Sequence, residues 1–295
     1  MAARFFHGAH KRRSYFEGWY VKQQNDIETV ALIPAFHVDA AGQASASVQI
    51  ITNERAHHIE YPASAFHADA HARSVSVGEN VFSETGCVLR IDTPDLKVSG
   101  ALAFGEFARP ETDIMGPFRR APFLECRHLV ASFCHTVDGD LTINGTPHRF
   151  FGDLGYIEGD RGRSFPTRYV WTQCLFDGGS LMLSAADIPY LGMKFTGVIG
   201  FTYAEGREIR IATYKGARFR RHDDGAIVVR QGRYTLEITP RAADAQLLRA
   251  PVAGGMTRLI RENASCEVHY RLTDRKQTLF DFTSTQAGYE DNWRV

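Results

Sequence analysis

The sequence has no excess of charge of one sign. Its 295 residues include 34 lysines and arginines and 34 aspartates and glutamates, so the formal net charge is zero. A protein that attracts nucleic acid or an anionic membrane through a broad electrostatic field usually has a clear basic excess. We therefore expect no nucleic-acid partner, and any membrane contact would be peripheral.

Long apolar segments are also missing. The N-terminal stretch MAARFFHGAHKRRSYF contains basic residues, but no apolar run of signal-peptide length follows them. No later window approaches the length of a membrane span. These absences predict a cytoplasmic protein without an integral membrane segment.

Cysteine is scarce, and its spacing shows no signature. An odd number of cysteines without a CxxC pair favours reduced, mostly buried thiols over a disulfide framework or a zinc site. The five are Cys87, Cys126, Cys134, Cys174 and Cys266. Histidines cluster in HHIEYPASAFHADAH, but on an extended chain His67 and His71 would lie about 13 Å apart, too far to bind one ion. We expect no metal site.

Signatures of nucleotide and hydrolase chemistry are absent as well. The chain has no GxGxxG after a strand, no P-loop, no GxSxG and no HExxH. We therefore expect no cofactor.

Short strand-like runs dominate what is present. They are rich in β-branched and aromatic residues, and turns such as VDGD and FDGGS separate them. The clearest runs are TVALIPAF, ASVQII, CVLRI, LKVSGALAF, SLMLSAA, FTGVIGFTY, AIVVR, YTLEI and TLFDFTS. Because little room remains for crossovers, the pattern predicts an all-β fold of two antiparallel units, closed into barrels or sandwiches, with few short helices.

Helical patterns and linkers are few. The best helical pattern is AADAQLLRA at 242–250, and the longest irregular stretch is 107–126, where prolines and a glycine oppose a strand. Asn144-Gly145 is a strong two-residue hairpin signal. We place a domain boundary after that hairpin, near residue 150, which predicts domains 1–150 and 151–295.

The N-terminal segment SYFEGWYVKQ predicts a strand. Alternation puts Tyr15, Glu17, Trp19 and Val21 on one face and Phe16, Gly18, Tyr20 and Lys22 on the other. Two interpretations stay open for Glu17: a carboxylate whose pKa is raised beside aromatic walls, or a paired residue on an edge strand whose aromatics pack in the core.

The central segment GYIEGDRGRSFPTRYVWTQC has two parts. Its glycines and proline predict a loop that carries Glu158, Asp160, Arg161 and Arg163. The following TRYVWTQC predicts a strand that presents Tyr169, Trp171 and Gln173 on one face. These three side chains line a ligand pocket in one interpretation and belong to an ordinary core strand in the other.

One histidine lies inside an apolar strand run. In ECRHLVASFCH, alternation places His128 on a face with Cys126 and Val130. Because the pKa of histidine is readily tuned, His128 is a candidate acid, base or hydrogen-bond donor. A satisfied core histidine is the alternative.

Two of these motifs together resemble the tocopherol cyclase family. Its plant members carry an FFEGWYFK-like segment and a central EKNWG…FPxKWFWVQC segment, and the chain has YFEGWYVK, then YIEGDRG and SFPTRYVWTQC, in the same order. The matched positions are Glu17, Gly18, Trp19, Tyr20, Glu158, Gly162, Phe165, Pro166, Trp171 and Gln173. Asp160-Arg161 stands where the plant pattern has Asn-Trp, and ECRH fits a family histidine position.

The resemblance implies two lipocalin-like β units and a reaction in which a prenylated hydroquinol closes to a chromanol. That reaction needs a proton on an alkene, a shielded tertiary carbocation and attack by a phenolic oxygen. A carboxylic acid in a dry pocket can supply the proton, and aromatic faces stabilise the cation.

These needs suggest a role for each candidate. Glu158 is the preferred acid and Glu17 the second choice. Asp160 either keeps Glu158 protonated through like-charge repulsion or pairs with a loop arginine. The walls around the cation are assigned to Trp19, Tyr20 and Trp171, and His128 or Gln173 would orient the phenol. Tyr169 is a further substrate-binding candidate.

Two functions without catalysis also fit the sequence. A lipocalin-like carrier could shelter a lipid or prenylquinone unchanged, because a fold does not determine a function. A purely structural or protein-interaction role is the third hypothesis. In the first two hypotheses, the partner is an apolar isoprenoid or prenylquinol-like molecule.

Overall fold

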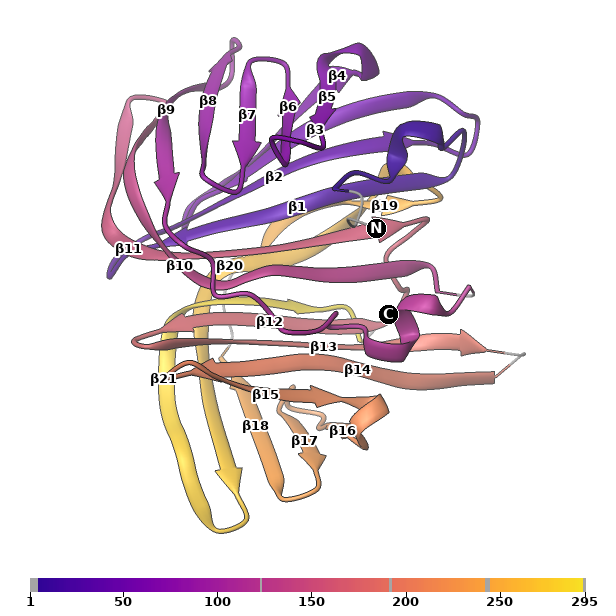
Figure 1. Ribbon diagram of the computed structural model, residues 1–295, viewed down its shortest axis with the longest axis vertical. Coiled ribbons are helices and arrows are strands. Elements are labelled where there is room, and N and C mark those ends of the chain that lie inside the picture. The colour runs from indigo at the N-terminus through magenta and orange to yellow at the C-terminus, as the bar shows by residue number, and fades with distance from the viewer. Residues whose placement is uncertain (1–4, 123, 191–192, 242–244, 294–295) are drawn as a thin grey trace. The chain divides into compact units, whose positions relative to one another are not determined.

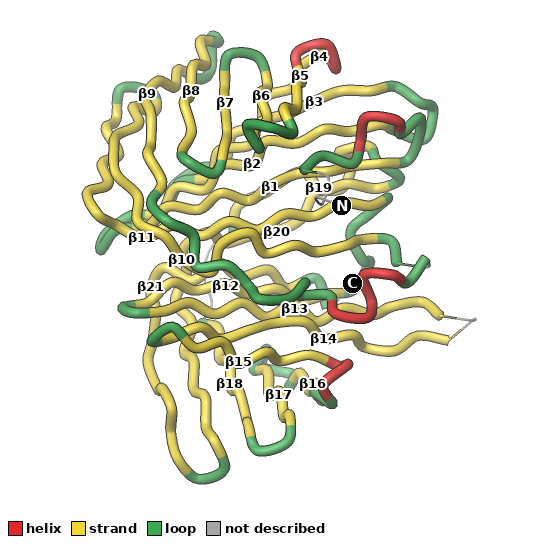
Figure 2. Tube along the Cα trace, viewed as in Figure 1, coloured by secondary structure: helices red, strands yellow, loops and turns green. Residues whose placement is uncertain are grey.

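The computed structural model describes residues 5–122, 124–190, 193–241 and 245–293. Most of this part is antiparallel β structure, as Figure 1 and Figure 2 show. Its helices are single short turns: η1 (Gly8–His10), η2 (Ala63–Ala65), η3 (Gly116–Arg120) and η4 (Thr213–Lys215). The predicted all-β fold is confirmed. No helix in these ranges is long and apolar enough to cross a membrane.

The chain forms two compact units. Unit 1 extends to Arg109, resumes over Glu125–Phe165 and takes in Leu248–Leu259. Unit 2 contains Pro110–Leu124, Pro166–Leu247 and the chain from Ile260 onward. Residue 150 lies within a strand of unit 1. The predicted boundary near residue 150, between domains 1–150 and 151–295, stays a prediction.

An antiparallel sheet of eleven strands builds unit 1, in the order β4-β3-β2-β1-β11-β10-β9-β8-β7-β6-β5. The strands are β1 (Tyr15–Gln24), β2 (Thr29–Val38), β3 (Ala44–Ile51), β4 (Ala56–Pro62), β5 (Phe66–Asp69), β6 (Ser74–Val77), β7 (Asn80–Ser83), β8 (Gly86–Asp92), β9 (Lys97–Phe104), β10 (Cys126–Ile143) and β11 (Thr146–Gly162). The turn between β10 and β11 is the predicted Asn144-Gly145 hairpin, in which both residues have positive φ.

One face of this sheet carries the hydrophobic core of unit 1, and we call it the core face. Trp19 and Val21 of β1, Val137 of β10 and Ile157 of β11 point into that core. Since side chains alternate along a strand, the residues between them point to the opposite face. β1 lies between β2 and β11, so it is an interior strand and not an edge.

A second sheet of ten strands has the order β15-β14-β13-β12-β21-β20-β18-β17-β16, with β19 paired to β20. Its strands are β12 (Tyr169–Phe176), β13 (Gly179–Tyr190), β14 (Met193–Ala204), β15 (Arg207–Ala212), β16 (Arg218–Arg221), β17 (Ile227–Gln231), β18 (Tyr234–Pro240), β19 (Gln246–Val252), β20 (Gly255–Asp274) and β21 (Gln277–Asp291). Its buried cluster, which includes Cys174, Leu183, Cys266 and Tyr270, is the core of unit 2.

The stretch 107–126 is irregular, as predicted. Its described residues before Cys126 contain only η3. In unit 2, the guanidinium of Arg210 donates to the carbonyls of Thr112 and Asp113, each at 3.0 Å. These bonds hold the segment in place without a strand.

The predicted helix at 242–250 is wrong where the structure describes it. Residues 242–244 lie outside the described residues, and Gln246–Val252 forms β19. Leu248 and Ala250 are buried while Leu247 and Arg249 are exposed, which is the alternation of a strand. Strand pairing therefore outweighs a weak helical propensity here.

A side chain secures β19 from within unit 1. The amide of Gln49 on β3 donates to the carbonyl of Arg249 at 3.2 Å and accepts from its N–H at 3.1 Å. Gln49 thereby satisfies both backbone groups of Arg249, as a neighbouring strand would.

The predicted loop around Glu158 is also wrong, since β11 continues to Gly162. Glu158, Asp160 and Arg161 lie on that strand, and only Arg163 follows it. The glycines there permit close approach instead of a turn: a methyl group on Gly162 would lie 2.0 Å from the carbonyl oxygen of Glu125.

Candidate functional site

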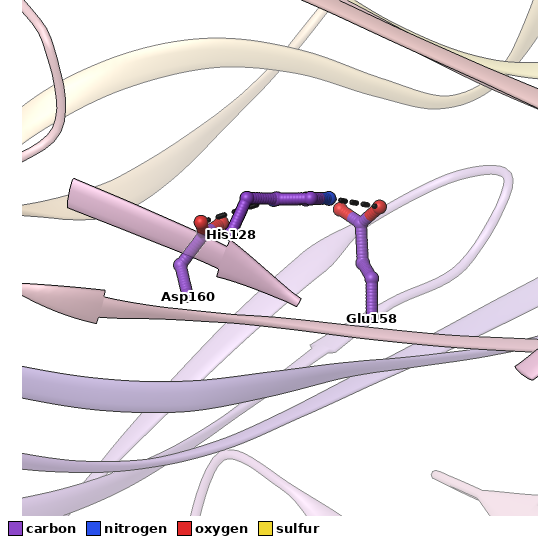
Figure 3. A group of neighbouring side chains, drawn as sticks. All are labelled: His128, Glu158 and Asp160. Atoms are coloured by element: carbon purple, nitrogen blue, oxygen red, sulfur yellow. Dashed lines mark hydrogen bonds and ion pairs between the residues drawn. The ribbon is translucent and has the colours of Figure 1, made fainter. Parts of the chain in front are cut away.

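Three adjacent strands of unit 1 bring candidate residues together. In the register of β10 and β11, His128 faces Asp160 and Val130 faces Glu158. Glu158 and Asp160 are two residues apart on one strand, so both point to the same face as His128. Figure 3 shows the imidazole ring of His128 between the two carboxylates. This face lies opposite the core face.

His128 contacts one carboxylate with each ring nitrogen. Its Nδ1 lies 3.0 Å from Oδ1 of Asp160. Its Nε2 lies 3.2 Å from Oε2 of Glu158, in ion-pair range although not aligned as a hydrogen bond. Both His128 and Glu158 are buried. The three side chains therefore form one compact, largely dry group.

The charge of this group follows from its surroundings. Burial lowers the pKa of His128, but the nearby Glu158 and Asp160 outweigh that effect, and the pKa of His128 lies well above its ordinary value. The ring is therefore an imidazolium at neutral pH. With two carboxylates beside it, the site holds a proton that both acids can accept.

Two further side chains donate to the carboxylates. The hydroxyl of Tyr156 donates to Oε2 of Glu158 at 2.6 Å, and Sγ of Cys126 donates to Oδ1 of Asp160 at 3.3 Å. Burial first, and then the adjacent carboxylate, raises the pKa of both groups well above its usual range. Sequence reasoning missed Tyr156, although its position two residues before Glu158 on a strand would have indicated a shared face.

The two alternatives for Asp160 now have a structural answer. Asp160 contacts His128 and Cys126, whereas Arg163 pairs with Glu125 at 3.2 Å. Arg161 is adjacent to Asp160 on β11, so it points to the core face. The predicted loop ion pair with an arginine is wrong because the segment is a strand.

Glu17 belongs to a separate cluster on the core face. Its Oε2 accepts from the hydroxyl of Tyr15 at 2.7 Å and from the backbone N–H of His7 at 2.8 Å, and its Oε1 lies 2.9 Å from Nδ1 of His7. Trp19 points to the same face. Tyr20, in contrast, faces Glu158 across β1 and β11. The structure thus brings His128, Glu158, Asp160 and Tyr20 to one face and leaves Glu17 and Trp19 on the other.

The other predicted binding residues lie on β12, in unit 2. Tyr169, Trp171 and Gln173 share a face of that strand, as alternation predicts. Tyr169 donates to Glu290 on β21, and a methyl group on Gly288 would lie 2.8 Å from the Trp171 ring. Gln173 is fully buried, and its amide has no hydrogen-bond partner in the described ranges.

Buried acids of unit 2 also escaped the sequence analysis. Glu290 faces Trp171 across β12 and β21, and Glu262 faces Glu290 across β20 and β21. Both acids are buried. Nothing in the local sequence marks Glu290 as a neighbour of Trp171, because β12 and β21 are far apart along the chain.

Histidine, glutamate and aspartate are also metal-binding types. One ligand atom from each of His128, Glu158 and Asp160 lies within 4.8 Å of the others. However, the ring presents opposite edges to the two acids, whereas an ion bound to a histidine contacts one nitrogen. The geometry favours shared protons, and the absence of a metal site stays a prediction.

No known family profile matches the chain, and no curated protein matches it. Several solved structures share its fold, including two that cover most of this chain. One is a protein from Nitrosomonas europaea provisionally named as an AttH, with a TM-score of 0.52, 14% identity, and coverage of 94% of this chain and 92% of that one. The other is kievitone hydratase from Nectria haematococca, with a TM-score of 0.52, 10% identity, and coverage of 95% and 90%.

At these identities the likeness concerns the fold alone. The fold is lipocalin-like, and this part of the expectation is confirmed. The tocopherol cyclase resemblance therefore contributes only to the proposal below.

Proposed function

We propose that the protein is a tocopherol cyclase-like enzyme that protonates a carbon–carbon double bond of an apolar prenylated quinol or similar isoprenoid. The observation that carries the proposal is the buried His128 held between Glu158 and Asp160. A buried group that stores a proton between two carboxylates is suited to acid–base catalysis.

The geometry refines which group holds the proton at rest. The sequence alone favours a protonated Glu158, whereas the raised pKa of His128 supports a resting state with the proton on the ring. Transfer of the Nε2 proton to Glu158 makes a neutral carboxylic acid and leaves a neutral ring, whose Nδ1 keeps its proton and donates to the Asp160 carboxylate. The hydroxyl of Tyr156 keeps the Glu158 carboxyl in position. Glu158 is thus the donor and His128 its supply.

The reaction balances without another reactant. The Glu158 proton adds to the less substituted alkene carbon and leaves a tertiary carbocation. The phenolic oxygen of the same molecule attacks that cation, and its proton passes to the Glu158 carboxylate, so the product is an isomer of the substrate. Water in place of the phenol would give hydration, the reaction class that the name kievitone hydratase denotes.

The test is turnover of prenylated hydroquinols by the full chain, followed by chromatography and mass spectrometry. We expect a product of unchanged mass, or of one added water, and a loss of about 100-fold or more in Glu158→Gln, the scale of general acid catalysis. Glu28→Gln is the matched control, because it breaks another histidine–glutamate pair of unit 1, His148–Glu28 at 2.7 Å. It should retain activity.

Other outcomes would decide against this assignment. Equal turnover by wild type and Glu158→Gln would show that Glu158 is not the acid. A loss of about 100-fold in Glu17→Gln alone would identify Glu17, on the core face, as the acid. If no substrate turns over and native mass spectrometry of protein from its own cells finds a stoichiometric, unmodified lipid, the protein is a carrier.

A further inference from the structure

We propose that residues 5–10, which we call the plug, cover a binding site of unit 1 whose ligand is a phenol, an aromatic ring with a hydroxyl donor. The plug precedes β1 and contains the short turn η1. Its rings pack on the core face, opposite the face that holds His128 and Glu158. The inference therefore does not depend on the proposed function.

The plug fills an aromatic pocket. Phe5 stacks on Trp19 with 5.7 Å between the ring centroids. Phe6 lies 5.4 Å from Phe36 and 4.9 Å from Phe66, and those two rings are themselves 5.1 Å apart. The rings that surround the plug belong to β1, β2 and β5. They therefore stay in place if the plug moves away.

A carboxylate lies beside this pocket. Glu17 faces Phe36 across β1 and β2, and it lies two residues before Trp19 on the same face of β1. Its Oε2 accepts from the backbone N–H of His7 at 2.8 Å, and its Oε1 lies 2.9 Å from Nδ1 of the same residue. Because an ionised carboxylate only accepts, Nδ1 carries the proton. The plug thus presents two rings and two N–H donors to the site.

The plug can leave without disturbing the sheet. The pairing of β1 with its neighbours begins at Tyr15, after the plug. Phe5, Phe6 and His7 are each half-buried, and such segments outside a sheet open more readily than paired strands. Opening takes two donors away from Glu17, which is buried, and a buried acceptor that loses its donors is costly. The molecule that replaces the plug must therefore supply a donor.

These features define the class of ligand. An aromatic ring would take the place of Phe6 beside Phe36 and Phe66. A hydroxyl would donate to Glu17 in place of the His7 N–H groups, as a charge-assisted hydrogen bond. Arg161 faces Glu17 across β1 and β11, so an ammonium group would meet a like charge. A phenol satisfies the pocket and the carboxylate, whereas an aryl ether satisfies only the pocket.

The experiment titrates the full chain with 2-naphthol and with 2-methoxynaphthalene, which has the same ring system without the donor. NMR follows the indole N–H signal of Trp19, and Trp19→Phe assigns it among the three tryptophans. Two variants weaken the plug and leave the site intact. Phe6→Ala removes a ring, and in Gly8→Ala the new methyl group would lie 2.7 Å from Cε2 of Phe6, so this ring must move.

A site that is open in only a fraction of the molecules has its apparent affinity reduced by that fraction. Both variants should therefore bind 2-naphthol at least about tenfold more tightly than wild type. In Phe6→Ala, 2-naphthol should bind about tenfold more tightly than 2-methoxynaphthalene, and adding Glu17→Gln should reduce this preference. In wild type, 2-naphthol should speed hydrogen exchange at the His7 N–H, because the plug must leave before the ligand binds.

Gly255→Ala is the matched control, because its methyl group would have an ordinary nearest contact of 3.6 Å and lies outside the plug. It should leave 2-naphthol affinity unchanged. Three results would overturn the site: equal 2-naphthol affinity in wild type and both plug variants, equal affinity of Phe6→Ala for the two naphthalenes, and an unmoved Trp19 signal. Variants that dimerise in light scattering without binding 2-naphthol would instead make the uncovered pocket an interface between copies of this chain.

Discussion

At His128, two carboxylates outweigh the effect of burial on the charge of the ring. His128 has Asp160 at 3.0 Å and Glu158 at 3.2 Å, so its pKa is raised despite burial. His135, also buried and on the same strand, has no carboxylate beside it among the residues that the structure describes. Its Nδ1 lies 2.9 Å from the Ser132 hydroxyl, its ring lies between Phe104 and Phe107, and burial lowers its pKa to about 3. At neutral pH, His128 is therefore protonated and His135, on the same strand, is neutral.

The first prediction concerns the pH dependence of stability at His128. Its folded-state pKa lies above the unfolded value, so its stabilising contribution is fully present below the ordinary value of 6.5 and is lost as the pH rises through the folded-state pKa. The difference in free energy of unfolding between wild type and His128→Gln should therefore shrink on the alkaline side. Urea unfolding over a pH series measures it.

His135 predicts the opposite sign and serves as the comparison. Its folded-state pKa is lowered, so the unfolded chain takes up the proton first, and stability falls as the pH drops from 6.5 toward about 3. The slope approaches about 1.4 kcal/mol per pH unit for one proton. His135→Phe should flatten this acid-side loss. If both variants changed the same limb of the curve, the two charge assignments would be wrong.

At the scale of elements, β11 shows how glycine can belong to a strand. Gly162 pairs with Cys126 on β10, and the carbonyl oxygen of Glu125 occupies the space of a side chain. From the sequence alone such glycines predict a loop, because glycine is common both in loops and where strands approach closely. Only the neighbouring strand distinguishes the two.

The second prediction follows from this contact. In Gly162→Ala, the new methyl group would lie 2.0 Å from a backbone oxygen that cannot rotate away, so β10 and β11 must separate. We expect a loss of roughly 1–3 kcal/mol in free energy of unfolding, as for overpacking, measured by urea titration. Gly255→Ala is the control, because its nearest contact would be an ordinary 3.6 Å. Equal losses in the two variants would contradict the argument.

At the scale of the whole molecule, the five cysteines are free thiols. Cys87 lies in the core of unit 1, where burial raises its pKa to about 12. Cys174 and Cys266 lie together in the core of unit 2. The predicted buried thiols are confirmed for these three, while Cys126 and Cys134 are half-buried.

The third prediction uses these thiols as reporters of unfolding. A thiol in a closed core reacts only when the core opens. Iodoacetamide labelling near pH 8, read by peptide mass spectrometry, should modify Cys134 first and Cys174 and Cys266 later at one common rate. Different rates for Cys174 and Cys266 would show that unit 2 does not open as one core.

The sequence by itself determined many of the strands and turns and the faces within the predicted strands, because alternation and turn chemistry are local properties. It missed β19 and the last residues of β11. It correctly placed Cys126 with His128, and Tyr169 with Trp171 and Gln173. It also singled out Glu158 and Asp160, but as residues of a loop.

Only the tertiary structure decided which faces meet. The register of β10 and β11 places His128 opposite Asp160, and a shift of one residue would turn His128 away from both acids. The Asn144-Gly145 turn sets the register where β10 and β11 meet, but three irregularities between Val130 and Asp138 shift it before the pairing reaches His128. No local sequence pattern encodes these shifts. The same pairing placed Glu17 on the core face and left Arg127 beside Arg161.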